Sequence, residues 1–184
     1  TTDMLMDGVH FHMSAASPAS IGRKLVNVSL SDLASMAAEP EAVFLSLCLP
    51  PKGPNGMPRD ILAAEMYEAV CDICELHWIA IAGGDTNCWE GALVVQLTAV
   101  GRVVNSRIWT RSGAKPNDLI VVTGPLGGSI LGKHLNFEPR LDVARAARNL
   151  AGIHAAMDIS DGFCLDLLRM CDASRCGAIV ELDK

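Results

Sequence analysis

The 184-residue chain lacks the features that mark nucleic-acid-binding and membrane proteins. It has no run of lysine or arginine and a formal net charge of −6, whereas a nucleic-acid-binding surface needs clustered basic residues. No stretch approaches the roughly 20 apolar residues that span a bilayer, and the N-terminal segment has no basic start followed by an apolar run. We therefore expect a cytoplasmic protein whose partner is a small molecule, with no nucleic acid or membrane involved.

Signs of a disulfide framework, a zinc site or a covalent nucleophile are also missing. The seven cysteines are an odd number in a chain without secretory features, which favours reduced thiols. Cys71 and Cys74 form a CxxC, but no second CxxC or histidine pair at zinc spacing accompanies it, and the pattern around it is helical. The chain has no G-x-S-x-G turn and no cysteine obviously paired with a histidine, so no covalent catalyst is expected.

Aromatic residues are scarce, at 4% of a chain that is 50% hydrophobic, and the apolar content is mostly Ala, Val, Leu, Ile and Met. Such a composition suits helices packed on a sheet and predicts an α/β or α+β enzyme domain. In chain order, the expected elements are an extended start at 1–6, a helix from Ser17 to about Ala38, a buried strand at 42–49, a helix at 59–76, a buried strand at 78–82, strands at 93–104 and 118–123, helices from about 129 and over 141–150, a strand at 155–158, a helix after 162 and a strand at 178–182.

Two connecting segments separate these elements. Residues 50–58 hold four prolines and two glycines and are expected to form a loop that moves or serves as a spacer. Residues 105–117 look like a connector, and a domain boundary there divides the chain into 1–112 and 113–184.

The segment from Gly127 to His134 nearly matches the phosphate loop G-x-x-x-x-G-K-[ST]. Histidine at its last position cannot supply the hydroxyl that holds magnesium in such a loop. A glycine-permitted turn before a helix start is therefore the better interpretation.

The most informative residues are five aspartates among small or hydroxyl neighbours: Asp3, Asp32, Asp85, Asp158 and Asp161. Taken singly, each could bend the chain, cap a helix or face solvent. Together they point to Mg²⁺, which takes oxygen ligands and is usually held by one or two carboxylates with substrate phosphates. Five carboxylates can hold more than one ion, which predicts phosphoryl transfer by positioning and charge neutralisation.

Two further residues are candidates for contacts with phosphate or substrate. Arg111 lies in a Ser-Gly-Ala context, where its planar guanidinium can bind two phosphate oxygens, or it is a surface arginine of the connector. His10 lies in a glycine-preceded loop seven residues beyond Asp3, from which it can reach an acceptor substrate.

These residues and the segments around them resemble the thiamine-monophosphate kinase family, part of the superfamily that holds aminoimidazole ribonucleotide synthetase. The matching segments are TTDMLMDGVHF, IGRKLVNVSLSDLASMAAEP, IAGGDT, RSGAKPNDLIVVTGPLGGS and AMDISDGFCLDL. GVHF points to this branch, because the relatives in purine synthesis carry a different sequence after the first aspartate.

The resemblance implies that the phosphate of thiamine monophosphate attacks the γ-phosphoryl group of ATP in line and yields thiamine diphosphate. It implies catalysis by positioning and by more than one Mg²⁺, with no catalytic side chain. It assigns magnesium to Thr1, Thr2, Asp3, Asp32, Asp85, Asp158 and Asp161, ATP to Gly84, Asp85, Arg111 and Ser160, and thiamine monophosphate to His10.

The resemblance also implies an α+β fold of two domains. The N-terminal domain, residues 1–112, binds ATP and Mg²⁺ and pairs with its twin in a homodimer, and residues 113–184 begin a C-terminal α+β domain that closes the nucleotide cleft. Family members have an acidic Gly-Asp-Asp motif upstream of Thr1 and continue beyond Lys184, so the chain is expected to be a fragment, to lack segments or to be a reduced relative. The alternatives are another ATP-using synthetase of the superfamily and a non-catalytic nucleotide-binding or dimerisation module.

Overall fold

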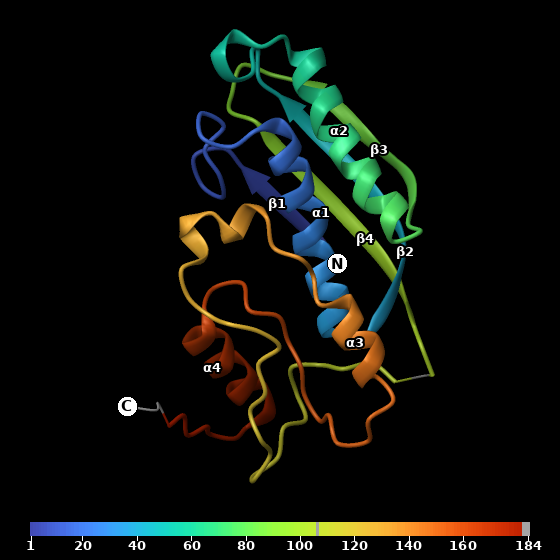
Figure 1. The fold of residues 1–184 in the computed structure, drawn as a ribbon, viewed down its shortest axis with the longest axis vertical. Helices are drawn as coiled ribbons and strands as arrows, with labels where there is room; N and C mark the ends of the chain where they lie inside the picture. The colour runs from blue at the N-terminus through green and yellow to red at the C-terminus, as the bar shows by residue number, and fades with distance from the viewer. Residues whose placement is uncertain (106, 182–184) are drawn as a thin grey trace.

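The computed structural model describes residues 1–105 and 107–181, and its first half is built on one four-stranded sheet (Figure 1). The strands are β1 (Thr2–Met6), β2 (Ala38–Leu49), β3 (Ala80–Cys88) and β4 (Val94–Val103), in the spatial order β1-β4-β2-β3. β2 and β3 run parallel, while β4 is antiparallel to both β1 and β2. The sheet places β1 and β3 at its two edges.

Two long helices, α1 (Pro18–Ser35) and α2 (Arg59–Leu76), lie side by side over one face of this sheet (Figure 1). Side chains of a strand alternate between its faces, and the alternate residues of β2 and β4 that face the helices are buried. The core of this layer is formed by Ile21, Leu25, Leu30, Val43, Leu45, Leu62, Val70, Val95 and Leu97. The opposite face, with Met4, Phe44 and Val100, is partly exposed, so the sheet has one covered and one open face.

The predicted start of α1 is confirmed, but its predicted end is wrong. Ser17 caps the helix by accepting a 3.2 Å hydrogen bond from the Ser20 amide. The helix ends at Ser35, and Ala37, with a φ of 56°, turns the chain directly into β2. Pro40 therefore lies inside a strand, at a register shift where its missing N–H is tolerated.

The prediction of a short buried strand at 78–82 is also wrong. β3 runs from Ala80 to Cys88, so the Gly-Gly-Asp-Thr segment is part of the strand, and most of β3 is exposed because it is an edge strand. A Cβ on Gly84 would lie 1.7 Å from the carbonyl oxygen of Leu45 on β2. Glycine is thus required by the close approach of two backbones.

In the second half, the helix predictions fare better than the strand predictions. α3 (Leu141–Ala147) and α4 (Phe163–Ser174) form near the predicted positions, whereas the helix predicted from 129 is only two short 3-10 turns, Ser129–Leu131 and Lys133–Leu135. Within the described residues, 118–123, 155–158 and 178–181 form no strand, and Leu182 lies outside them. The apolar side chains of Leu119 and Val121 are 90% and 81% exposed, and no strand of the described residues pairs with this segment.

Polar contacts tie the second half to α1 and β2. Glu39 on β2 forms ion pairs with Arg145 and, at 2.9 Å, with Arg148 at the end of α3. Asn27 on α1 donates a 2.7 Å hydrogen bond to the carbonyl oxygen of Phe137.

Among the helices of the described residues, none is long and apolar enough to cross a membrane.

Candidate metal and nucleotide site

Three of the five aspartates lie within electrostatic reach of one another. Asp3 is on β1 and pairs in register with Leu97, which places its side chain on the helix-covered face beside α1, the helix that carries Asp32. Burial raises the pKa of Asp3, and the Asp32 carboxylate raises it further. Burial followed by the charges of Asp32, Asp166 and Asp3 raises the pKa of Asp158 to about 6. A cation at this point would relieve the repulsion between these carboxylates.

Hydroxyl groups orient two of these carboxylates. Ser29, one helical turn before Asp32, donates a 2.6 Å hydrogen bond to Asp3 Oδ2, and Thr1 Oγ1 donates to Asp32 Oδ2. The bond from Ser29 favours the charged form of Asp3 and so opposes the effect of burial on its pKa. Among residues 1–105 and 107–181, no group of three His, Cys, Asp or Glu side chains is arranged to hold an ion alone. An ion held here would need water or phosphate oxygens as additional ligands, as is usual for Mg²⁺.

Asp85 lies apart from this cluster, on the other face of the sheet. Its partner in register is Ser46 on β2, whose neighbour on β4 is Gln96, and this row belongs to the open face. Asp85 also sits on the edge strand opposite β1, about 14 Å away across three strand spacings. Its carboxylate accepts hydrogen bonds from the Thr86 amide and from Asn87 Nδ2, at 2.9 and 2.8 Å.

Thr2 and Gly84 are likewise outside the cluster of Asp3, Asp32 and Asp158. Thr2 Oγ1 lies 3.1 Å from Thr98 Oγ1 and accepts a hydrogen bond from Gln96, so its side chain is on the open face. Gly84 is on the edge strand β3. The expected magnesium and ATP residues are therefore distributed over both faces of the sheet.

The loop before α4 carries Asp158, Ser160 and Asp161. The carboxylate of Asp161 forms an ion pair with Arg169 of α4. The backbone amides of Ser160 and Asp161 both donate to Asp166 Oδ2, at 3.0 and 2.9 Å. Side chains of α4 therefore hold this loop in place.

Sequence reasoning missed Ser29 and Asp166. Ser29 precedes Asp32 by three positions, a spacing that places two helical residues on one face, and this was the available signal. Asp166 lies in the first turn of α4, where an acidic side chain often accepts hydrogen bonds from amides near a helix start. Neither position resembles a metal ligand by its neighbours alone.

Arg111 lies in the connector and is exposed. Its carbonyl oxygen accepts a 2.9 Å hydrogen bond from Ser174 Oγ, which ties this part of the connector to the end of α4. Within the described residues, its guanidinium group has no hydrogen-bond or ion-pair partner, and it is available to an anionic ligand.

His10 is held by both its ring and its backbone. His10 Nδ1 accepts a 3.0 Å hydrogen bond from the Met6 amide, and its carbonyl oxygen accepts a 2.6 Å bond from Lys24 Nζ. Lys24 on α1 is only 8% exposed and also lies 3.0 Å from His134 Nδ1. Burial lowers the pKa of Lys24, and burial together with the Lys24 charge lowers the pKa of His134, so His134 is neutral and accepts this bond.

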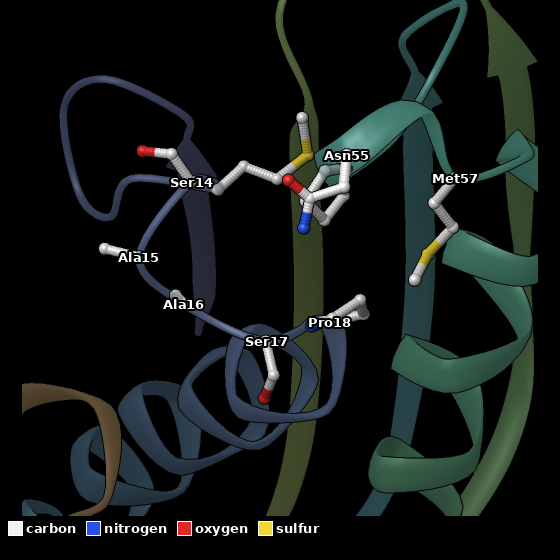
Figure 2. A pocket seen from close by; sticks show the side chains of 9 residues that line it. Ser14, Ala15, Ala16, Ser17, Pro18, Asn55 and Met57 are labelled. Atoms are coloured by element: carbon white, nitrogen blue, oxygen red, sulfur yellow. The ribbon is translucent and has the colours of Figure 1, made fainter.

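Two neighbouring hollows adjoin the loop that carries His10. The larger, of about 590 Å³, lies between residues 13–18 and residues 54–57, and Figure 2 shows Ser14 and Ser17 on one side with Asn55 and Met57 on the other. The smaller, of about 390 Å³, is lined by Asp7, Gly8 and His12 and shares Met13, Ser14, Pro54 and Asn55 with the larger. Neither hollow is lined by Asp3, Asp32 or Asp158.

Comparison with known proteins gives consistent results. The chain is 41% identical over 182 residues to the thiamine-monophosphate kinase of Rhodopirellula baltica, covering 99% of this chain and 55% of that protein. The crystal structure of thiamine monophosphate kinase from Aquifex aeolicus superposes with a TM-score of 0.82 at 27% identity, covering 95% of this chain and 63% of that one. A structure of AaThiL complexed with AMPPCP and TMP has a TM-score of 0.76 at 23% identity, covers 95% of this chain and 60% of that one, and shows likeness of fold.

The chain spans about 55% to 60% of the length of most of the curated relatives that it matches. Family models match both halves: residues 1–103 match the N-terminal domain of the AIR synthase related proteins, and residues 110–184 match the C-terminal domain. On this evidence, the chain belongs to the AIR synthase related protein family.

Proposed function

We propose that the protein phosphorylates thiamine monophosphate to thiamine diphosphate, with ATP as the donor. The observation that carries this proposal is the convergence of Asp3, Asp32 and Asp158 on one negatively charged region. The relatives named as thiamine-monophosphate kinases and the AaThiL complex with AMPPCP and TMP support the choice of ATP and thiamine monophosphate over other substrates.

Phosphoryl transfer requires the protein mainly to position the reactants and to help neutralise the charge on the phosphoryl oxygens. Bound Mg²⁺ supplies neutralisation of the charge on the phosphoryl oxygens. Asp3, Asp32 and Asp158 would hold it, since their carboxylates repel one another without a cation. The loop with Ser160 and Asp161 would place the nucleotide, and Arg111 would bind phosphate oxygens with its guanidinium group. His10, held from both sides, would contact the acceptor thiamine monophosphate.

We extend the proposal to the full set of site residues expected from the sequence. Magnesium, more than one ion, is assigned to Thr1, Thr2, Asp3, Asp32, Asp85, Asp158 and Asp161, and ATP to Gly84, Asp85, Arg111 and Ser160. Because Thr2 and Asp85 belong to the open face, their part in the site requires that this face also contact the ligands or a second protomer.

A homodimer formed through the N-terminal domain, residues 1–112, is part of the proposal, with residues 113–184 belonging to a C-terminal domain. The open sheet face supports the dimer, because Met4, Phe44 and Val100 leave apolar area in contact with water. A cytoplasmic location agrees with the seven free cysteines, since thiols stay reduced in that compartment.

The decisive experiment incubates the complete gene product with ATP, MgCl₂ and thiamine monophosphate and quantifies thiamine diphosphate by fluorescence after oxidation to the thiochrome. We expect stoichiometric formation of thiamine diphosphate and ADP. Folded protein that binds ATP with Mg²⁺ and forms no thiamine diphosphate would overturn the proposal in favour of a binding module. Turnover of ATP with a different acceptor would favour a synthetase of the same superfamily.

A further inference from the structure

Asp166 is the most deeply buried carboxylate of the described residues, with 1% of its surface exposed. It lies in the first turn of α4, beneath the loop that carries Asp158, Ser160 and Asp161. A buried charge is costly unless hydrogen bonds and an opposite charge compensate it. The contacts that compensate Asp166 therefore identify what it organises.

All of these contacts go to the loop or to α4 itself. Asp166 Oδ2 accepts from the amides of Ser160 and Asp161, at 3.0 and 2.9 Å, and Oδ1 accepts from Arg169 Nη1 at 2.9 Å. Arg169 Nη1 also bonds to the Asp161 carboxylate. One carboxylate thus fixes two successive backbone amides, and through Arg169 it also fixes the side chain of Asp161.

The two amides have no partner in regular secondary structure. Ser160 and Asp161 are exposed residues outside any helix or strand, and Gly162, with a φ of 106°, turns the chain into α4. Without Asp166, the directions of these two peptide units would be set only by the chain on either side. Their direction decides where Asp158, Ser160 and Asp161 present their oxygen atoms.

We propose that Asp166 is a positioning residue that fixes the Asp158–Asp161 loop for binding of a magnesium–nucleotide complex, acting through the Ser160 and Asp161 amides. This inference rests on the proposed function for the identity of the ligand. The role of Asp166 in shaping the loop is measurable without turnover. In this role, Asp166 holds the loop in place and is not itself a ligand of the magnesium or the nucleotide.

The first test needs no substitution. Amide hydrogen exchange of the wild-type protein, followed by ¹H–¹⁵N NMR, is expected to show Ser160 and Asp161 protected despite their exposure, with amide protons shifted downfield by the carboxylate. Exchange of both amides at the rate of an unstructured chain would overturn the proposal, whatever the activity of the protein.

The second test compares Asp166→Asn with Asp172→Asn, which removes the same charge from an exposed position of the same helix. Asp166→Asn is expected to shift the Ser160 and Asp161 amide resonances and to weaken binding of Mg²⁺ with the non-hydrolysable analogue AMPPCP by roughly 10- to 100-fold, as for other residues that orient a ligand-binding group. Its KM for thiamine monophosphate should change much less. Asp172→Asn should leave all three unchanged.

Arg169→Gln provides a second test of the proposal in case Asp166→Asn does not fold. It removes the contact to Oδ1 and retains both amide contacts to Oδ2. The amides should therefore stay protected in Arg169→Gln. Equal losses of nucleotide binding in Asp166→Asn and Asp172→Asn would contradict the proposal, whereas wild-type protein that binds nucleotide but makes no thiamine diphosphate would contradict only the proposed function.

Discussion

Ser29, fully buried in α1, donates a 2.6 Å hydrogen bond to Asp3 Oδ2 on β1. This bond connects the helix that carries Asp32 with the edge strand that carries Asp3. It orients the Asp3 carboxylate and favours its charged form, and so opposes the effects of burial and of the neighbouring Asp32 charge, which raise the pKa of Asp3. The geometry of the candidate metal site therefore depends on a residue that itself binds no metal.

Ser29→Ala is expected to raise the pKa of Asp3 further and to destabilise the protein by about 1–2 kcal/mol, because a partly buried carboxylate loses its hydrogen-bond donor. Chemical denaturation at neutral pH measures the free energy of unfolding, and calorimetry measures Mg²⁺ affinity. Ser31→Ala on the same helix is the matched control, since Ser31 is less buried. Equal behaviour of the two variants would show that the Asp3 bond contributes nothing.

Asp158 makes stability depend on pH. Its pKa is raised from 3.8 to about 6, so the folded state binds this proton more tightly than the unfolded state does. The stabilising contribution is present at pH values below the unfolded pKa and is lost as the pH rises to about 6. Asp158→Asn should remove this decline and raise the free energy of unfolding at pH 7 by about 1–2 kcal/mol, allowing for partial solvation. Denaturation curves recorded between pH 3.5 and 8 test this prediction. It is contradicted if the free energy of unfolding depends on pH as steeply in Asp158→Asn as in the wild type.

The same substitution should have the opposite effect on ligand binding. Asp158→Asn removes one of the three converging carboxylates, so Mg²⁺ should stabilise the variant against thermal unfolding less than it stabilises the wild type. Asp172→Asn, with its side chain exposed on α4, should respond to Mg²⁺ as the wild type does. A Mg²⁺-induced rise in Tm that is equal in all three proteins would place the ion elsewhere.

Glu39 anchors α3 to the sheet. Hydrogen bonds from Arg145 lower the pKa of Glu39, so its contribution to stability is present above the unfolded pKa and is lost as the pH falls through the folded pKa. Glu39→Gln should cost about 1–2 kcal/mol and speed hydrogen exchange in α3, because two arginines lose their partner. Glu41 lies on the same strand as Glu39 and forms an exposed ion pair with Arg102 of β4. Glu41→Gln breaks this pair and should cost less than about 1 kcal/mol. Similar costs would mean that the α3 contact is no stronger than a surface pair.

Lys24 links His10 to the segment that contains His134. Lys24→Met removes the 2.6 Å bond to the His10 carbonyl oxygen while keeping the length of the apolar stem. Faster hydrogen exchange is expected in residues 8–12 and 133–137, and the KM for thiamine monophosphate should rise more than the KM for ATP. Arg23→Met, at the neighbouring position of α1, serves as the control. Unchanged exchange in both segments would contradict the link.

Local signals in the sequence predict four of the five expected helices and the strands at 1–6, 42–49 and 93–104, whereas the strands expected in the second half do not form within the described residues. α2 runs over 59–76 as expected because its apolar period and the preceding proline loop are local features. The strand predicted at 78–82 stops before Gly83 and Gly84, but the close approach of Gly84 to β2 keeps both glycines inside β3. The apolar run at 118–123 predicts a strand, yet an apolar run alone supplies no hydrogen-bonding neighbour.

In the candidate site, too, local sequence context identifies some residues and not others. The neighbours of Asp3, Asp32 and Asp158 suggested ligands, and the structure brings these three into electrostatic contact. Asp85 had an equally suggestive context, but its face of the sheet follows from register, which depends on pairing between distant residues. Ser29 acts through a hydrogen bond to the distant Asp3, and Asp166 acts through hydrogen bonds to the amides of Ser160 and Asp161 in the preceding loop; the neighbours of Ser29 and Asp166 in the sequence identify neither bond.

The approach of β3 to β2 at Gly84 gives the last prediction. Gly84→Ala would place a methyl group 1.7 Å from the Leu45 carbonyl oxygen, so the two strands must separate or shift, at a cost of roughly 2–4 kcal/mol. The shift would also move Asp85, the next residue on β3, so loss of stability and loss of any role of Asp85 should appear together. Gly152→Ala, where the new methyl group meets no atom within 4 Å, is the control for the substitution itself. If Gly84→Ala unfolds with the same midpoint as Gly152→Ala, β3 is not held against β2 as closely as the structure describes.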